Sequence, residues 1–231
     1  MSRSHPEAAS ERTRVRRVPQ RAAYDRATID AILDEALVCH VGLTSESQPF
    51  VMPTVHWRIG DELYIHGSAA SRMMEHGGDG IPLCVTVTLV DGVVLARSAF
   101  HHSMNYRSVV ILGQARIVVE RDEKLDALTA LVNRFSPGRA EHVRAPNPQE
   151  LKATTVLALP IVEASAKVRR GGPIDDDEDL ALPVWAGVIP LRVEALPALV
   201  SDPQIAGAEV PSLGFPRAFA VGAASVRSEN T

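Results

Sequence analysis

The feature that most constrains the fold is a series of short segments in which apolar residues recur at every second position. Between residues 37 and 97, Ser, Gly and Asp, which favour tight turns, separate these segments. Alternation with a period of two is typical of a strand that buries one face. Several such strands joined by short turns indicate an antiparallel barrel or sandwich.

Strands are predicted over residues 37–44, 49–59, 62–66, 83–89, 93–97 and 106–120, with further extended structure over 154–168. Pro53 lies inside the second strand, so we expect an edge, a bulge or a place where a ligand replaces a neighbouring strand. Asp91-Gly92 separates the fourth and fifth strands and predicts a hairpin turn there.

Helical spacing is limited to a few places. It predicts helices over 27–36 and 121–135, a helical turn over 147–153, and a loop entering a short helix over 67–75. Because strands do not alternate with helices, a parallel sheet is disfavoured. We therefore expect a mainly β (α+β) fold, an antiparallel barrel with a few peripheral helices.

Charge divides the chain unevenly. Residues 1–21 hold six arginines and two glutamates, a net charge of +4, which leaves −8 on the remaining 210 residues. An acidic body is a poor partner for nucleic acid, and ten aromatic residues provide no stacking platform. We expect a basic flexible N-terminal segment over 1–20, a solvated acidic loop over 175–179 and a loosely ordered tail over 196–231.

Cysteine and histidine spacing indicates no metal centre. Cys39 and Cys84 lie in strand-like contexts without Cys-x-x-Cys spacing, which favours buried reduced thiols and a cytoplasmic protein. His101 and His102 are adjacent, so on a strand they would point to opposite faces and not share an ion. No stretch is apolar and long enough to span a membrane, and we expect no membrane association.

A loop that could hold a phosphate follows the third strand. His66-Gly67-Ser68 leads through small residues to Ser71-Arg72 at the start of the short helix. Backbone N–H groups at a helix N-terminus, a hydroxyl and a guanidinium suit an anion, and small residues allow close approach. The alternative is that Ser68 or Ser71 simply caps the helix.

Seven short stretches of this sequence resemble stretches of the pyridoxamine 5′-phosphate oxidase-related flavoproteins, especially those of the nitroimidazole-reductase-like branch. The order and spacing of the stretches match as well. They span roughly residues 15–195. The stretches are Arg21-Ala22-Ala23-Tyr24-Asp25, Cys39-His40-Val41-Gly42, Tyr64-Ile65-His66-Gly67-Ser68, Ser71-Arg72-Met73, Asn105-Tyr106-Arg107-Ser108-Val109, Ala166-Lys167-Val168-Arg169 and Val184-Trp185-Ala186-Gly187-Val188-Ile189-Pro190.

The resemblance implies a split β-barrel over residues 21–195 that binds FMN at a homodimer interface. It assigns the FMN phosphate to Ser68, Ser71 and Arg72, and it places Gly67 among the cofactor-binding residues. It assigns the isoalloxazine ring to Met52, Pro53 and Thr54. Further flavin or phosphate contacts are implied for Asn105, Tyr106, Arg107 and Ser108.

Two more residues come from the resemblance. His66 matches a histidine beside the flavin, and Trp185 matches a residue that reaches the flavin from the partner subunit. One departure concerns Met73, because the family's Ser-Arg-Lys reads Ser-Arg-Met here. The missing lysine removes one positive charge from the phosphate site, and Arg107 is a candidate to replace that charge.

The resulting hypothesis is an FMN-dependent oxidoreductase that passes electrons from NADH or NADPH to a small organic acceptor. His66 would donate a proton or position the acceptor, or alternatively make only a supporting hydrogen bond. Pyridoxamine-phosphate oxidase activity itself is disfavoured, because no second set of basic residues is present for a substrate phosphate.

The alternative is a non-catalytic module that binds flavin, deazaflavin or haem, or acts as a sensor. Haem would need an axial ligand, for which the sequence offers His40, His56, His101 and His102 without ranking them.

Overall fold

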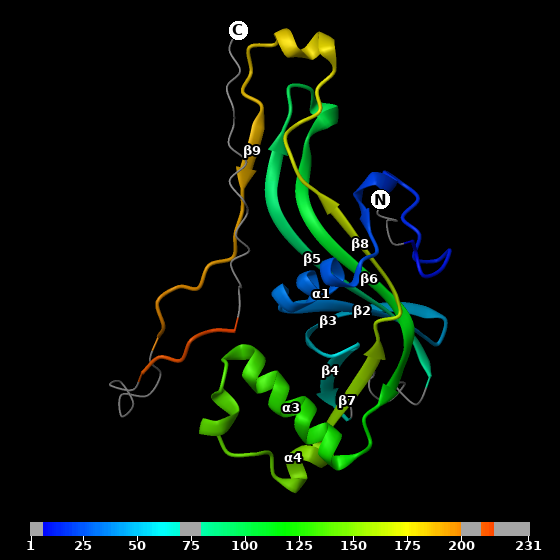
Figure 1. Ribbon diagram of the computed structural model, residues 1–231, viewed down its shortest axis with the longest axis vertical. Helices are drawn as coiled ribbons and strands as arrows, with labels where there is room; N and C mark the ends of the chain where they lie inside the picture. Colours follow the sequence, from blue (N-terminus) through cyan, green and yellow to red (C-terminus); the bar gives the residue numbers. More distant parts are fainter. Residues whose placement is uncertain (1–6, 70–79, 200–208, 215–231) are drawn as a thin grey trace, which may run out of the picture.

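The computed structural model describes residues 7–69, 80–199 and 209–214 of the 231-residue chain (Figure 1). Its α-helices are α1 (Arg26–Glu35), α3 (Arg121–Phe135) and α4 (Pro148–Ala153). Single 3-10 turns are η1 (Pro19–Arg21), η2 (Ala99–His101), η3 (Arg139–His142) and η4 (Asp177–Ala181). The strands are β1 (Ala22–Ala23), β2 (Val38–Ser45), β3 (Gln48–Ile59), β4 (Glu62–Ser68), β5 (Ile81–Leu95), β6 (Ser103–Ile117), β7 (Thr154–Pro160), β8 (Glu163–Arg169) and β9 (Gly187–Pro190).

The strands form an antiparallel barrel, which confirms the expected fold class. Neighbours run in the order β6-β7-β4-β3-β2-β5, and a pairing between β5 and β6 closes the ring. β8 and β1 extend the sheet from β6, and β9 extends it from β5. Closure leaves few exposed strand edges, which suits a chain built from many short alternating strands.

The barrel interior is the main hydrophobic core. It is filled by the inward members of each alternating strand, including Val41, Ile65, Val85, Ile111 and Leu157, all fully buried. Helix α1 closes this core with Ile29, Ile32 and Leu33, the residues whose spacing predicted the helix.

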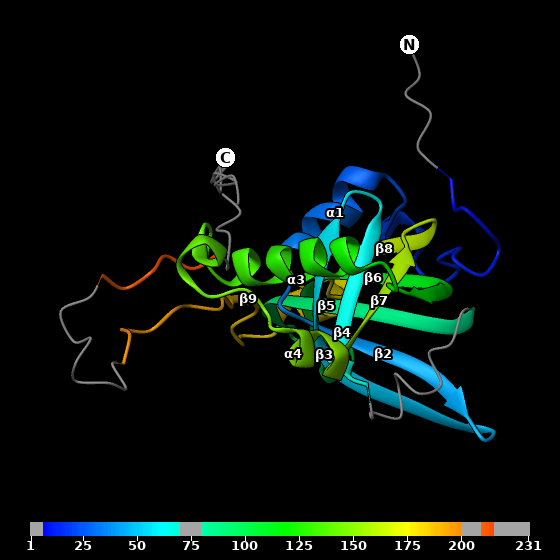
Figure 2. The same ribbon diagram turned by 90° about the horizontal axis from the view of Figure 1, so that it is seen from below.

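A second, smaller core lies outside the barrel wall. Trp57 and Tyr64 stack there at 5.9 Å between ring centroids, and Ala127 and Leu131 of α3 cover them. Helix α3 accordingly lies across β4 (Figure 2). Arg134 of α3 donates hydrogen bonds to three backbone carbonyls at the end of α1, so the two helices are tied together.

Helix boundaries follow local signals. Asp25 caps α1 by accepting a hydrogen bond from the Thr28 backbone N–H at 2.8 Å. Asn147 and Glu150 form a reciprocal capping box at the start of α4. The predicted helices over 27–36 and 121–135 and the helical turn over 147–153 are therefore confirmed.

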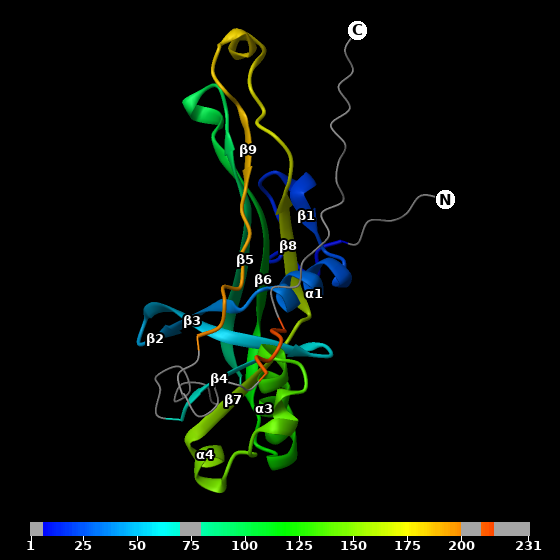
Figure 3. The same cartoon turned by 90° about the vertical axis from the view of Figure 1, so that its left-hand side faces the viewer.

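A long projection extends the sheet beyond the barrel. We call residues 90–106 together with 171–190 the arm; it contains the ends of β5 and β6, with η2, η4 and β9 (Figures 1 and 3). The predicted hairpin at Asp91-Gly92 is wrong here, because β5 runs straight through this dipeptide. The register against β6 shifts between Val90 and Gly92, so the extra residue forms a β-bulge instead of a turn.

Other expectations have mixed outcomes. The acidic run is not wholly solvated, because the buried Asp175 carboxylate accepts hydrogen bonds from the backbone and guanidinium of Arg97. Cys39 and Cys84 are free thiols, buried and half-buried respectively. The loop and short helix predicted over 67–75 lie largely outside the described residues. Within the described part of the chain, no helix has the length and apolar character needed to cross a membrane.

Candidate functional site

The residues expected to line a flavin ring lie where β3 has a neighbour on one side only. Over Gln48–Val55, β3 pairs with β2, whereas β4 pairs with β3 only over His56–Ile59. Pro53, opposite His40, thus lies in a stretch with a single described neighbour. This arrangement confirms the edge expected for Pro53, because proline cannot donate to a second strand.

His66, Gly67 and Ser68 lie at the end of β4, on the other side of the same opening. The β3–β4 pairing ends at His56 and Ile65, after which β4 follows β7 and β3 follows β2. We call this opening, bordered by 52–54 and 66–68, the β3–β4 fork. Figures 1 and 3 show β4 turning away from β3 at this point. The structure therefore brings two of the expected groups together.

The His66 ring is half-buried against Trp57, with 5.8 Å between ring centroids. Its Nδ1 atom is buried and has no hydrogen-bond partner among the described residues. Burial lowers the pKa of His66, so the imidazole is neutral at pH 7. A neutral ring with an unsatisfied nitrogen can hydrogen-bond a ligand without bringing a charge to it.

The third group, on β6, is not part of the fork within one chain. The register places β2 and β5 between β3 and β6, so at about 4.8 Å per strand these two strands are about 14 Å apart. Along β6 the residue in register with Met52 is Ile111, so residues 105–108 lie farther away still. Asn105 accepts a hydrogen bond from Arg169 and donates one to the Gly171 carbonyl. Ser108 donates to the Lys167 carbonyl, and Tyr106 pairs with Val90 and Arg169.

Arg107 already contacts two carboxylates. Its guanidinium donates to Glu35 of α1 and, at 2.7 Å, to Asp91 in the β5 bulge. The hydrogen bonds that Arg107 donates to these carboxylates, Glu35 first, raise the pKa of Arg107 further above its usual range. The contact of Arg107 with a flavin phosphate stays a prediction, and any such phosphate would compete with two anions.

The remaining expected residues lie elsewhere. Ser71 and Arg72, together with Met73, fall outside the described residues. Trp185 is largely exposed on the arm, where its ring packs so closely over Gly187 that a Cβ there would lie 2.9 Å from Cζ2. Its expected role toward a partner subunit stays a prediction.

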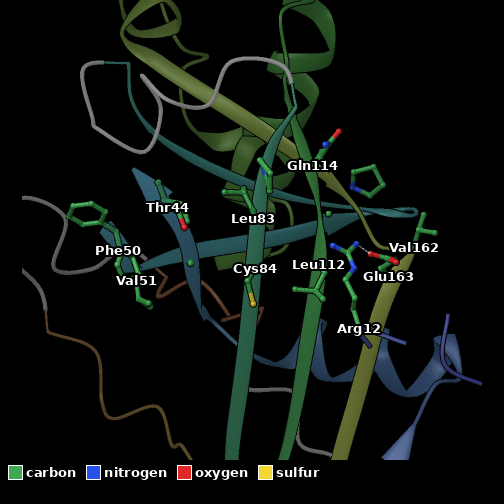
Figure 4. Close-up of a pocket in the computed structure, with 16 residues that line it drawn as sticks. Arg12, Thr44, Phe50, Val51, Leu83, Cys84, Leu112, Gln114, Val162 and Glu163 are labelled. Carbon is green, nitrogen blue, oxygen red and sulfur yellow. Dashed lines mark hydrogen bonds and ion pairs between the residues drawn. The ribbon is translucent and has the colours of Figure 1, made fainter. Parts of the chain in front are cut away.

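A groove that the sequence analysis missed lies between β2–β3 and β5–β6 (Figure 4). Its volume is about 720 Å³. β2 pairs with β5 only from His40 to Gly42, so the strands part beyond Gly42 and Cys84. The walls are mostly apolar, with an ion pair between Arg12 and Glu163 on one side. The sequence feature that could have indicated this groove is a proline near the end of each of three strands, Pro49, Pro82 and Pro160.

The comparisons with known proteins agree with this architecture. The family model described as pyridoxamine 5′-phosphate oxidase matches residues 25–168, more than half of the chain. The chain belongs to the pyridoxamine 5′-phosphate oxidase family. No match was found among curated proteins.

Two solved structures resemble almost the whole chain of this family member. The flavocytochrome Anf3 from Azotobacter vinelandii has 43% sequence identity and a TM-score of 0.82, covering 92% of this chain and 96% of its own. The FAD and haem binding protein from Mycobacterium smegmatis has 39% identity and a TM-score of 0.79, covering 83% and 94%.

A more distant structure shares the fold. It is described as a candidate 5-nitroimidazole antibiotic resistance protein from Bacteroides thetaiotaomicron, with 22% identity, a TM-score of 0.52 and coverage of 64% and 86%. Its similarity extends to the barrel topology, in keeping with the family resemblance identified from the sequence.

Proposed function

We propose that this protein binds a flavin and transfers electrons through it. The observation that supports this most is the near-complete similarity, at 43% and 39% identity, to two proteins named as a flavocytochrome and an FAD-binding protein. Coverage of 92% of the chain in the first case takes in the arm as well as the barrel.

The β3–β4 fork suits a flavin ring. An edge stretch at 52–54 offers backbone groups on its open side, and the buried Nδ1 of His66 needs a partner. Gly67 and Ser68 continue toward Ser71 and Arg72, which we retain as the proposed phosphate site. The candidate flavins are FMN and the larger FAD, and the relative from M. smegmatis is named for FAD.

A homodimer is part of the proposal. The outward face of the sheet includes the register row Val51–Gly42–Cys84–Leu112, and no described helix packs on it. A second copy on this face would bring its own β6 residues and Trp185 toward the fork. The fork of one chain and the β6 group of the other would then form one site.

A bound flavin supplies hydride and single-electron chemistry, and the side chains position the reactants. Because the lowered pKa keeps His66 neutral at pH 7, it would act as a hydrogen-bonding group that orients the ring or a small acceptor. Donation of a proton by a protonated His66 is less compatible with this lowered pKa. We propose NADH or NADPH as the donor and a small organic molecule as the acceptor.

Haem is the second candidate ligand. Both close relatives are named for it, one as a flavocytochrome and one as an FAD and haem binding protein. We therefore propose that this chain binds haem together with the flavin, and a bound haem would supply one-electron chemistry.

The test is a visible spectrum of the purified full chain, followed by anaerobic addition of NADH or NADPH. We expect oxidised-flavin bands that bleach on reduction, and a Soret band if haem is also bound. Mass spectrometry of the released cofactor separates FMN from FAD. A colourless protein that takes up neither flavin when both are added would overturn the proposal.

A matched pair of variants tests the phosphate assignment of Arg107. Arg107 and Arg116 each bind two carboxylates, Glu35 with Asp91 and Glu62 with Glu123. If Arg107 contacts the flavin phosphate, Arg107→Ala loses flavin whereas Arg116→Ala retains it. Equal flavin content in the two variants would limit Arg107 to a structural role.

A further inference from the structure

A small polar pocket lies where the ends of α1 and α3 meet β3. Its walls include Asp34 of α1, Trp57 and Arg58 of β3, Arg134 of α3, and Gly214. We call it the Trp57 pocket. Its volume is about 210 Å³, which equals the space of about seven water molecules in the liquid. The pocket therefore has room for a small ion or molecule and is too small for a nucleotide.

One wall is built by a segment that returns from far along the chain. Residues 209–214 reach the end of α3 (Figure 1), where the Gly214 N–H donates to the Phe135 carbonyl at 2.9 Å. A Cβ at residue 214 would overlap the Arg134 carbonyl oxygen, so only glycine fits this contact. The sequence thus allows the segment to pack closely against α3 and to border the pocket.

Trp57 places a buried donor at this pocket. Its side chain is 1% exposed, and the Nε1–H is buried without a hydrogen-bond acceptor among the described residues. Tyr64 stacks on the ring with 5.9 Å between centroids, and His66 packs against it at 5.8 Å, but neither accepts this hydrogen. Buried N–H groups in folded proteins are nearly always paired. Because Trp57 lines the pocket, a ligand bound there can supply the acceptor.

The charged side chains of the described wall favour an anion. They are two arginines and one aspartate, a net charge of +1. The Asp34 carboxylate accepts two hydrogen bonds from Arg58, at 2.6 and 3.0 Å, so these two charges offset each other. Arg134 supplies the remaining positive charge. Its guanidinium is held in place by hydrogen bonds to the Asp34 and Leu33 carbonyls, at 2.9 and 3.2 Å. The pocket is therefore positive and rich in donors.

We propose that the Trp57 pocket binds a small monocarboxylate. The two carboxylate oxygens would accept hydrogen bonds from the Trp57 indole and the Arg134 guanidinium, groups that only donate. One negative charge balances the net charge of the wall, whereas a phosphate dianion would exceed it. The volume admits a carboxylate with a short side chain. The pocket shares no wall residue with the β3–β4 fork, and the proposal does not depend on a bound flavin.

The test follows the indole N–H groups of the full chain by proton–nitrogen correlation NMR. The sequence has two tryptophans, so the wild type should give two indole resonances, and Trp185→Phe identifies the one from Trp57. Trp185 is largely exposed on the arm and is the control within the same spectrum. Sodium acetate is the probe, and sodium chloride and inorganic phosphate at equal ionic strength are the comparisons.

We expect acetate to move the Trp57 indole proton downfield to a plateau, because a hydrogen bond to a carboxylate deshields it, and to leave that of Trp185 in place. Arg134→Gln should weaken acetate binding about tenfold, since it removes a hydrogen bond to a charged group. Arg116→Gln is the matched control, because Arg116 is also half-buried but lies outside the pocket, and it should bind acetate as the wild type does.

The wild-type titration needs no variant, so it decides the proposal even if Arg134→Gln fails to fold. A Trp57 resonance that acetate does not move, or that chloride moves equally, would overturn the site. A plateau with phosphate but not with acetate would overturn the assignment to a carboxylate. An equal loss of acetate binding in folded Arg134→Gln and Arg116→Gln would contradict the role of Arg134.

Discussion

At the scale of single residues, His56 shows how burial controls ionisation. The side chain is fully buried, and its Nε2–H donates to the Leu33 carbonyl at 3.0 Å. Burial lowers the pKa of His56 from its ordinary 6.5 to about 4, although the hydrogen bond that His56 donates to the Leu33 carbonyl opposes this. The charge of Arg134 lowers it further, whereas that of Asp34 raises it. The native protein thus keeps this imidazole neutral.

Protonation in the unfolded state should make stability depend on pH. When the pH is lowered from 8 to 5, the unfolded chain binds a proton at His56 that the folded chain does not. The free energy of unfolding should therefore fall by about 2 kcal/mol as the pH is lowered over this range. Urea unfolding at both pH values measures this loss. His56→Gln keeps a donor for Leu33 but does not titrate, so its loss should be smaller by that amount. Equal losses in wild type and variant would contradict the prediction.

At the scale of elements, the β5 bulge shows why a turn signal was overridden. Asp91-Gly92 suits a tight hairpin, but β6 is long enough to pair with β5 on both sides of the dipeptide. The bulge also turns Asp91 toward Arg107. Gly92 then lies against β9, and a Cβ on it would lie 3.0 Å from the Ile189 carbonyl and from Val188 Cγ1.

Gly92→Val should therefore weaken the docking of β9. We expect a loss of about 1–3 kcal/mol in unfolding free energy, because the side chain overfills a closed contact. Thermal or urea unfolding measures the loss. Gly172→Val is the control, since a Cβ at Gly172 meets nothing within 4 Å. Equal unfolding free energies of the two variants would show that β9 shifts to accommodate the added side chain without a loss of stability, and would contradict the prediction.

At the scale of the whole molecule, the outward sheet face is the surface on which the proposed homodimer would form. Val51 is 67% exposed on this face, in a row with Gly42 and Cys84. Val119 is 77% exposed outside the sheet, just before α3. An exposed valine on an uncovered sheet face is expected at an interface between copies, whereas a single exposed valine in a loop needs no such explanation.

Val51→Glu should break the proposed homodimer, and Val119→Glu should not. A carboxylate buried between two copies would be desolvated without a partner, so it opposes association. Size-exclusion chromatography with light scattering measures the mass of each variant. A wild-type monomer, or a dimer that survives Val51→Glu unchanged, would contradict this interface.

Much of the barrel was predictable because its determinants are local. The alternation in β2 and β3, the spacing of Ile29, Ile32 and Leu33, and the Asp25 cap each depend on nearby residues. The site was predictable only in part. His66–Ser68 and Met52–Thr54 could be assigned by resemblance, but their meeting at the fork depends on where the β3–β4 pairing ends.

The sequence by itself determined which segments are strands and helices, because side-chain periodicity and capping act over a few residues. Only the tertiary structure decided the bulge at Asp91, the burial of Asp175 and the two carboxylates on Arg107. These features depend on residues 16 to 78 positions apart in the chain. Pairing between segments that are distant in the sequence brings these partners together. The local pattern of apolar and polar residues does not specify that pairing.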